Sequence, residues 1–375
     1  MKFIITQPNL FRGLSITEKI IGRNLTLPIL QNILVSCEKN KGCVRLCSTN
    51  LEIGVEVLIP AKIEQEGSIT IPARLFLGLV QNLPDEKVEV SEKNNTILVQ
   101  CKNYKANIKG EPAGEFPLIP SAAASDVIRV KNDALRLGIS SVISCASPLD
   151  VKPEITGIYT QFQKRDMCFA ATDSFRLAEK KILTDTKNTH QVNVIIPKRT
   201  GEAILRVFEG AEQTLHVQTN ENQLFIQNVP QDSSLPHVRL VSRVIAGEYP
   251  NYEQIIPTTF STTVEVSRDE IVSHIKSASL FSLKVNEVRI QTNPAKQELG
   301  IESRDQECGN HSSTIPCLVQ GKEVGFAFNY TYLLDGIQNI PSATIVMKCN
   351  EATTPVLITS PEGDGFRYVV MPIKT

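Results

Sequence analysis

One short stretch of the sequence recurs three times and limits the chain to a repeat architecture. The copies run from Cys43 to Val55, from Met167 to Ala178 and from Leu299 to Cys308. In each copy an alternating pattern indicates a strand, and an Asn or Asp then marks a turn before a second strand. The three turn residues, Asn50, Asp173 and Asp305, are spaced by 123 and 132 positions, which is the length of a whole domain. The sequence therefore predicts three similar domains.

The segments around the recurring stretch also repeat, and they predict an α+β fold with domains at residues 1–121, 122–258 and 259–375. Helices are expected at Thr6 to Asn24 with Thr6 as N-cap, Ala73 to Asn82, Asn132 to about Cys145, Pro197 to Phe208, and after Ser267 and Asn329. Ser267 and Glu270 form a capping box. Strands are expected at Ile29 to Cys37, Cys43 to Thr49, Leu51 to Ile59, Val88 to Val90, Thr96 to Cys101, Tyr104 to Ile108, Val127 to Val130, Val192 to Ile196, Thr263 to Val266, Val324 to Phe328 and Gly365 to Ile373.

The composition is that of a soluble globular protein. Hydrophobic residues make up 41% of the chain, and no apolar run approaches the roughly 18 residues of a membrane span. Met1 to Thr6 alternates like a strand and does not resemble a signal peptide. We therefore expect a cytoplasmic protein without a membrane partner. The net charge of −1 neither requires nor excludes nucleic acid, because one face can be basic while the rest is acidic.

No residue pattern points to catalysis, a metal or a cofactor. The chain lacks the common phosphate-binding, dinucleotide-binding, zinc-protease and serine-hydrolase motifs, and its five histidines are not paired at ligand spacing. The nine cysteines are an odd number in mostly apolar strands, so we interpret them as buried, reduced thiols. Asp173 and Arg176 could be imagined as a catalytic pair, but a turn Asp followed by such an Arg more often stabilises a hairpin.

Several predicted helices carry cations on one face. Arg12, Lys19 and Arg23 fall within a stripe about 40° wide, since each residue turns a helix by about 100°. Arg199 and Arg206 share a face in the same way, as do Arg74 and Gln81. Such a stripe is usually only a solvated face, and a phosphate-binding surface is the alternative.

The sequence also resembles a known family, the beta subunits (beta sliding clamps) of bacterial DNA polymerase III. The resemblance spans the whole chain. It is carried by Met1-Lys2-Phe3, Thr26 to Leu30, Thr49 to Glu52, Pro72-Ala73-Arg74, Glu115-Phe116-Pro117, Ala171 to Ala178, Tyr249 to Tyr252, Phe328-Asn329 and Tyr368 to Pro372.

The resemblance implies a head-to-tail homodimer whose six similar domains close into a ring, with sheets outside and helices lining a channel around double-stranded DNA. DNA-binding residues would be Arg12, Lys19, Arg23, Arg74, Arg136, Lys198, Arg199 and Arg206. Phosphate contacts without base readout would let such a ring slide. The dimer interface would involve Ala106 and Ile108 against Leu280.

The resemblance also implies a pocket between the second and third domains. It would bind short peptides of the DNA polymerase III catalytic subunit, the clamp loader and other proteins with a clamp-binding motif. The matching residues are Ile155, Thr172, Ser174, Phe175, Arg176, Leu177, Pro250, Ile255, Val285, Asn329, Tyr332, Val356, Val369, Val370, Met371, Pro372 and Ile373. We expect Val369 to Ile373 to be an exposed apolar wall of a groove whose other wall is Leu177, Pro250 and Ile255.

Two readings from other classes remain open. One is a hydrolase or transferase on a three-domain β-rich scaffold, with its activity in a constellation that no motif reveals. The other is a structural β-repeat protein of the cell surface, which the unpaired thiols and the missing signal peptide oppose. Retention on circular rather than linear DNA would separate all three.

Overall fold

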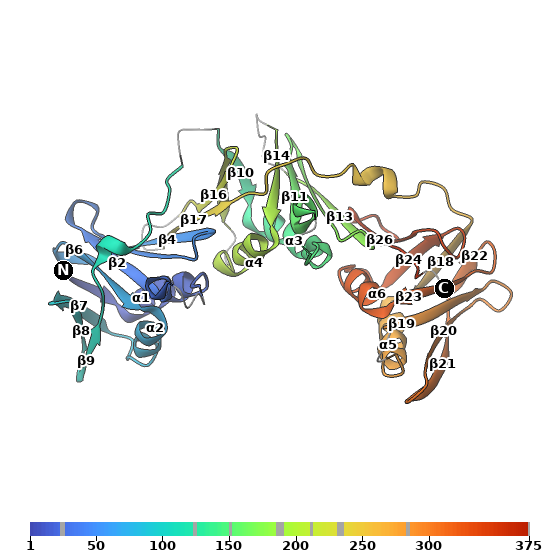
Figure 1. Cartoon of the computed structure of the whole chain (residues 1–375), viewed down its shortest axis with the longest axis horizontal. Helices are drawn as coiled ribbons and strands as arrows, with labels where there is room; N and C mark the ends of the chain where they lie inside the picture. Colours follow the sequence, from blue (N-terminus) through green and yellow to red (C-terminus); the bar gives the residue numbers. More distant parts are fainter. Residues whose placement is uncertain are drawn as a thin grey trace. The chain divides into compact units, whose positions relative to one another are not determined.

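The computed structural model describes residues 1–22, 27–122, 126–149, 152–184, 191–210, 213–230, 236–282 and 286–373. The same order of elements occurs three times, which confirms the threefold repeat (Figure 1). Each repeat opens with a strand and a helix, continues with a group of strands and a second helix, and ends with three strands.

The first repeat comprises β1(Lys2–Thr6), α1(Gln7–Glu18), β2(Asn32–Glu38), β3(Cys43–Thr49), β4(Ile53–Pro60), β5(Lys62–Gln65), β6(Gly67–Pro72), α2(Ala73–Gln81), β7(Lys87–Lys93), β8(Thr96–Cys101) and β9(Tyr104–Lys109). The second comprises β10(Ile128–Lys131), α3(Asn132–Val142), β11(Gly157–Phe162), β12(Asp166–Thr172), β13(Arg176–Leu183), β14(Val192–Pro197), α4(Lys198–Val207), β15(Thr214–Thr219), β16(Gln223–Asn228) and β17(His237–Arg243).

The third repeat comprises β18(Thr262–Ser267), α5(Arg268–Ser279), β19(Glu287–Asn293), β20(Glu298–Asp305), β21(Gly309–Pro316), β22(Leu318–Gln320), β23(Gly325–Asn329), α6(Tyr330–Ile337), β24(Thr344–Cys349), β25(Val356–Thr359) and β26(Phe366–Val370). Short 3-10 helices lie at Pro28–Gln31, Lys39–Lys41, Ala113–Glu115, Ile143–Cys145, Pro153–Thr156 and Tyr252–Ile255.

The chain divides into two compact units, each described by itself here. Unit 1 contains residues 1–136, 163–165 and 184–246, and unit 2 contains residues 137–162, 166–183 and 247–375. Unit 1 holds the sheets β5-β1-β7-β8-β9 and β10-β15-β16-β17-β4-β3-β2-β6. Unit 2 holds β21-β20-β19-β23 and the run β11-β12-β13-β26-β25-β24-β18-β22. Because β17 joins β4 and β26 joins β13, the last strand of one repeat extends a sheet of the repeat before it.

The helices pack on one face of these sheets, and their contacts are made by small residues and buried apolar side chains. Helix α1 packs on β3 and β4, and a Cβ on Gly13 would lie 2.1 Å from Ile59 Cδ1, so only glycine permits this close approach. Leu10 and Leu14 are fully buried beside it. The recurring β3-β4, β12-β13 and β20-β21 hairpins each occur once in a repeat, as the sequence predicts.

Several predicted boundaries were wrong for local reasons. Helix α1 ends at Glu18 rather than Asn24, and Thr6 flanks it without a side-chain capping bond. The segment Pro28–Gln31 is a 3-10 helix, not the start of a strand, because Pro28 fits the first helical turn. The last strand, β26, ends at Val370 instead of Ile373.

Other predicted ends were accurate. In the capping box, Ser267 accepts a hydrogen bond from the backbone N–H of Glu270 at 3.4 Å. Asn329 caps α6 by accepting from the N–H of Thr331 at 2.9 Å.

Candidate functional site

The recurring turn has the same internal hydrogen bonds in all three repeats. Oδ1 of Asn50, Asp173 and Asp305 accepts from the backbone N–H groups two and three residues later, at 2.7 to 3.2 Å. In the first two repeats the next residue adopts a left-handed conformation, with φ of 75° at Leu51 and 78° at Ser174. The turn residues therefore serve the structural role expected from the sequence, and each turn projects two side chains outward.

Arg176 connects the second turn to the third repeat. Its guanidinium donates to Asp173 Oδ2 at 3.0 Å and to the carbonyl of Ser144 at 2.9 Å, and it is ion-paired with Asp335 on α6. It also lies over the ring of Tyr332, 4.3 Å from the centroid. Burial opposes the charge most strongly, but the hydrogen bond with Asp335 and the nearby groups Tyr368, Cys145 and Asp173 together outweigh it, so the pKa of Arg176 is raised. The Arg176 cation therefore links the second turn to helix α6.

Both junctions between repeats contain a buried carboxylate paired with an arginine on the facing strand. Glu56 on β4 lies opposite Arg239 on β17, with an ion pair of 2.9 Å. Glu179 on β13 lies opposite Arg367 on β26, and Arg367 Nε donates to Glu179 Oε1 at 2.7 Å. The two glutamate side chains are only 10% and 1% exposed. One arrangement is thus used twice to hold consecutive repeats together.

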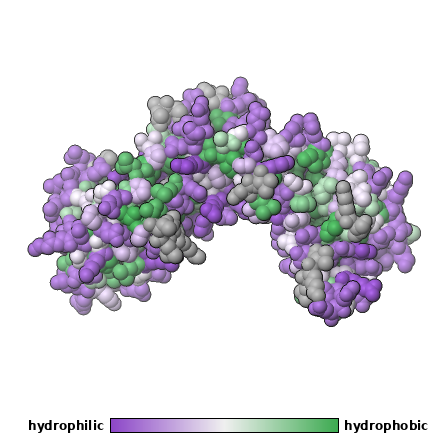
Figure 2. Space-filling model, viewed as in Figure 1, coloured by the Kyte–Doolittle hydropathy of each residue, from purple (hydrophilic) through white to green (hydrophobic). Residues whose placement is uncertain are grey.

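An apolar surface lies beside the second turn. Phe175 is 59% exposed and stacks on Tyr332, with ring centroids 6.5 Å apart. Ile255, 49% exposed, directly precedes Ile256, which belongs to a buried cluster with Leu177 and Val369. Figure 2 shows a mostly hydrophilic surface in which hydrophobic patches are separate, so clustered apolar groups of this kind are informative.

The predicted peptide-binding residues differ in their access to this surface. Ser174, Phe175, Pro250 and Ile255 are exposed; Arg176, Asn329, Tyr332, Met371 and Ile373 are half-buried; and Ile155, Thr172, Leu177, Val356, Val369, Val370 and Pro372 are buried. Val285 lies outside the described residues.

The predicted exposed C-terminal wall was wrong. Val369 and Val370 complete the ladder with β13 and β25, and the backbone N–H of Ile373 donates to Ala327 at 2.7 Å. The inner residues therefore support the surface from below, while the exposed ones are available to a ligand.

The predicted DNA-binding cations fall into two groups. Arg12, Arg74, Arg199 and Arg206 are exposed, although Arg74 and Arg199 lie 3.6 and 3.7 Å from Glu18 and Glu52. Lys198 is half-buried at the start of α4, and Arg23 lies outside the described residues.

Lys19 and Arg136 instead bind backbone carbonyls of helix α4. Lys19 Nζ donates to the carbonyl of Arg206 at 2.7 Å, and Arg136 donates to that of Leu205 at 2.8 Å. Cations at these carbonyls complement the negative C-terminal end of helix α4.

The predicted dimer residues differ in how exposed their side chains are. Leu280 is 66% exposed at the end of α5, and Ala106 on β9 is half-buried. Ile108 is only 4% exposed in the single chain and lies opposite Ile97 on β8, and its place in a dimer interface stays a prediction. On a strand, alternate residues face opposite sides, and Ile108 faces the core of the first repeat.

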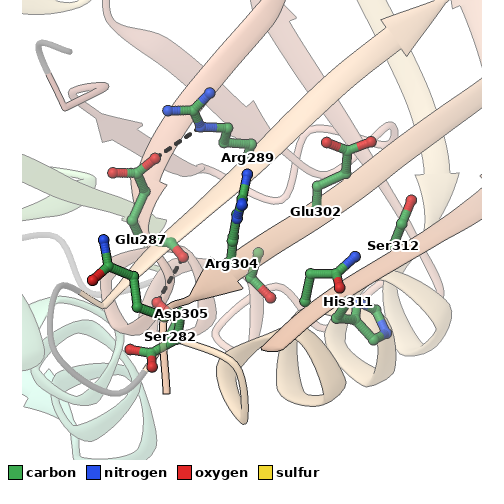
Figure 3. A pocket seen from close by; sticks show the side chains of 11 residues that line it. Ser282, Glu287, Arg289, Glu302, Arg304, Asp305, His311 and Ser312 are labelled. Carbon is green, nitrogen blue, oxygen red and sulfur yellow. Dashed lines mark hydrogen bonds and ion pairs between the residues drawn. The ribbon is translucent and has the colours of Figure 1, made fainter. Parts of the chain in front are cut away.

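A polar hollow of about 730 Å³ lies on the third repeat beside strand β21 (Figure 3). Its rim carries both signs of charge, from Glu302 and Asp305 as well as Arg289 and Arg304. Arg289 Nε donates to a carboxylate oxygen of Glu287 at 2.9 Å. Because charges of both signs lie side by side, the hollow has the character of an ordinary polar protein surface.

Within the described ranges, no cluster of His, Cys, Asp and Glu is arranged to hold a metal ion. Six of the nine cysteines are buried and Cys308 is exposed, so the prediction of buried thiols was wrong for Cys308. Burial raises the pKa of Cys37, Cys47 and Cys145 to about 12. Among the same residues, no helix is long and apolar enough to cross a membrane.

Comparison with known proteins assigns the family. Residues 1–120, 129–251 and 253–374 match the N-terminal, central and C-terminal domains of the DNA polymerase III beta subunit. The chain belongs to this family.

Individual members resemble the chain along its whole length. The beta sliding clamp of a Synechocystis species is 28% identical and that of Bacillus subtilis 26%, each over the whole of this chain and at least 99% of the relative. The crystal structure of the Bacillus subtilis DNA polymerase sliding clamp has a TM-score of 0.91 at 26% identity. That of the Thermotoga maritima DNA polymerase III beta subunit has 0.90 at 25%, and each covers 100% of this chain and 99% of the other.

Sequence reasoning missed several residues of this beta subunit that the structure brings together. Asp335 was not among the predicted site residues, yet it pairs with Arg176, which lies 159 positions away. Glu56, Arg239, Glu179 and Arg367 were not singled out at all. A usable signal existed for the glutamates, because both occupy the same position after the recurring turn.

Proposed function

We propose that two copies of this chain close head-to-tail into a ring that encircles double-stranded DNA and slides along it as the processivity clamp of a DNA polymerase III. Membership of the beta subunit family supports this proposal. The domain boundaries 1–121, 122–258 and 259–375 are part of the proposal, as is a place in the cytoplasm, where bacterial replication occurs.

The observation that carries the proposal is the construction of the two junctions within the chain. In each, the second strand of the recurring hairpin, β4 or β13, pairs with the last strand of the next repeat, β17 or β26. The corresponding strand of the third repeat is β21, and the corresponding last strand of the first repeat is β9. Both are end strands of their sheets. Unpaired edges invite pairing with another chain, and a head-to-tail interface of this kind closes into a ring when the rotation permits.

Charge supports the pairing of β9 with β21 of a second copy. Lys105 on β9 lies opposite Gln100, just as Arg239 on β17 lies opposite Gln227, so Lys105 takes the place of Arg239. The position on β21 that corresponds to Glu56 is occupied by Ser312. Ser312 pairs with Glu302 on β20, which lies at the rim of the polar hollow. Lys105 would thus lie near Glu302 of the second copy, and this attraction would favour the proposed partner and register.

The exposed cations on α1, α2 and α4 support the contact with DNA. Arg12, Arg74, Arg199 and Arg206 belong to helices of unit 1, where α1 packs against both α2 and α4. Attraction to phosphates carries no sequence information, so it holds a duplex without fixing its position. Sliding requires this property.

The apolar surface beside Arg176 is proposed to bind a short peptide from the DNA polymerase III catalytic subunit, the clamp loader or another protein with a clamp-binding motif. Phe175 and Ile255 supply exposed anchor contacts, and Tyr332 and Met371 flank them. A few buried anchors give modest affinity, which suits the exchange of partners. The chain itself is proposed to have no active site, so polymerase activity would belong to the holoenzyme.

Topological retention tests the proposal. Protein loaded onto nicked circular DNA should stay bound through a high-salt wash, and cutting the circle once should release it. Equal retention on circular and linear DNA would contradict encirclement. A hydrolase or a surface protein would show no difference between the two substrates.

A further inference from the structure

A small cavity with both apolar and polar lining lies beside the first recurring turn, entirely within unit 1. Its volume is about 180 Å³, and it is lined on one side by Leu51 and Gly54 and on the other by Pro117, Leu118 and Ile119. Leu51 is 48% exposed and Leu118 is 97% exposed. Single exposed leucines are ordinary, but two at the mouth of one cavity leave an apolar surface that nothing in the described chain covers.

This cavity repeats the construction of the proposed peptide site. Leu51 occupies the left-handed position that Ser174 occupies in the second turn. Ile119 packs against Gly54, as Ile256 clusters with Leu177 at the matching strand position. The flanking strands β4 and β17 pair in the register of β13 and β26.

The exposed aliphatic groups also correspond. Leu118 and Ile119 in the segment Leu118-Ile119-Pro120 match Ile255 and Ile256 in Ile255-Ile256-Pro257. Each junction thus combines an exposed aliphatic residue with an isoleucine that follows it, which is buried at Ile256 and half-buried at Ile119.

The rim of the cavity adds an electrostatic preference. Arg243 is exposed there, and in the part of the chain that the structure describes its guanidinium has no ion pair. Its backbone N–H donates to the carbonyl of Glu52 at 3.1 Å, which fixes the position of the residue. The Glu52 carboxylate already lies 3.7 Å from Arg199. The rim therefore favours a ligand with a carboxylate.

We propose that this cavity is a second peptide-docking site, which takes one Leu or Ile side chain from an extended segment of a partner protein with an Asp or Glu beside it. The inference rests on the proposed function, because it treats the second junction as a peptide site and the first as its copy. The small volume restricts the ligand to one aliphatic side chain. The carboxylate would meet Arg243.

Methyl NMR of the full dimeric protein tests the two junctions separately. Labelled Leu51, Leu118 and Ile119 report on the first junction, and Ile255 and Leu177 report on the second. The probe is acetyl-Gly-Asp-Leu-Gly-amide. Two matched peptides replace its Leu by Ser or its Asp by Asn.

We expect the Asp-Leu peptide to shift the methyl signals of the first junction in a saturable way. The Ser peptide should lose at least about tenfold in affinity, because the aliphatic group is gone. The Asn peptide should lose about threefold to fivefold, as expected for one partly exposed charge contact. Arg243→Ala should remove the difference between the Asp and Asn peptides, and Arg129→Ala, on β10 away from the cavity, should preserve it.

The possible outcomes separate this inference from the proposed function. Shifts confined to the second junction would overturn the second site and leave the proposed peptide surface intact. Shifts at the first junction alone, together with no binding of a longer motif peptide at the second, would support the second site and contradict the proposed peptide surface. Equal shifts with the Leu and Ser peptides would overturn the aliphatic specificity.

Discussion

Glu56 and Arg239 face each other across the first junction with an ion pair of 2.9 Å, although 183 positions separate them in the chain. Glu179 and Arg367 repeat this relationship at the second junction. In the proposed junction between two copies, Ser312 and Lys105 occupy the same positions. In the proposed ring, the buried carboxylate would thus be confined to the two junctions within each chain and absent from the junction between copies.

Ser312→Glu should strengthen the dimer, because it restores the missing partner of Lys105. We expect the dissociation constant measured by analytical ultracentrifugation to fall roughly threefold to tenfold at low salt. Gln320→Glu adds the same charge on β22 of the third repeat and should leave the constant unchanged. Combining Ser312→Glu with Lys105→Glu should reverse the gain, and persistence of the gain in that double variant would contradict the proposed register.

Arg176→Ala should destabilise the protein by about 3 to 5 kcal/mol, because it leaves the half-buried partners Asp173 and Asp335 without their cation. Chemical denaturation monitored by circular dichroism measures this loss. Arg165→Ala removes an exposed arginine from a turn and should change the stability by less than about 0.5 kcal/mol. A small effect of Arg176→Ala would show that the ion pairs contribute little to the junction.

The triple variant Arg12→Glu, Arg74→Glu and Arg199→Glu should weaken retention on circular DNA and reduce the salt dependence of binding. Removing about three phosphate contacts lowers the slope of log K against log salt by about 2.7. The matched control replaces Lys93, Lys164 and Lys296, three exposed lysines outside the helices, by Glu. If both triple variants lost retention equally, net charge rather than the helical face would be responsible.

Ile255→Ser should weaken binding of a motif peptide at least about tenfold, since it removes an exposed anchor from the second-junction surface. Fluorescence anisotropy with a labelled peptide measures the change. Leu183→Ser alters a residue that is 89% exposed elsewhere and should have no effect. Truncation after Val370 would not test this surface by itself, because buried Pro372 and the hydrogen bond of Ile373 would be lost as well.

Thiol labelling at pH 8 should modify exposed Cys308 well before Cys37, Cys47 and Cys145. Burial raises the pKa of these three thiols from 9.0 to about 12, so they stay protonated and covered. The raised pKa values also make the free energy of unfolding depend on pH. The three thiols contribute fully to stability below pH 9, and this contribution is lost as the pH rises toward 12, because in that range the thiols ionise in the unfolded chain and not in the folded one. Mass spectrometry of the labelled peptides gives the order, and early labelling of Cys145 would contradict its burial.

The sequence by itself determined the threefold repeat, the recurring Asx turn and most strands, because these depend on local periodicity and on side chains that bond their own backbone. It also placed Phe175, Ile255 and the helical cations on candidate surfaces. Tertiary structure alone decided which of them are accessible: Val369 and Val370 became core residues once β26 joined β13, and Ile108 turned inward against Ile97. Likewise, only folding could pair Arg176 with Asp335 or Glu56 with Arg239, since contacts between residues more than 150 positions apart depend on which sheets join. Local chemistry fixes the turn, and long-range strand pairing fixes what the turn presents.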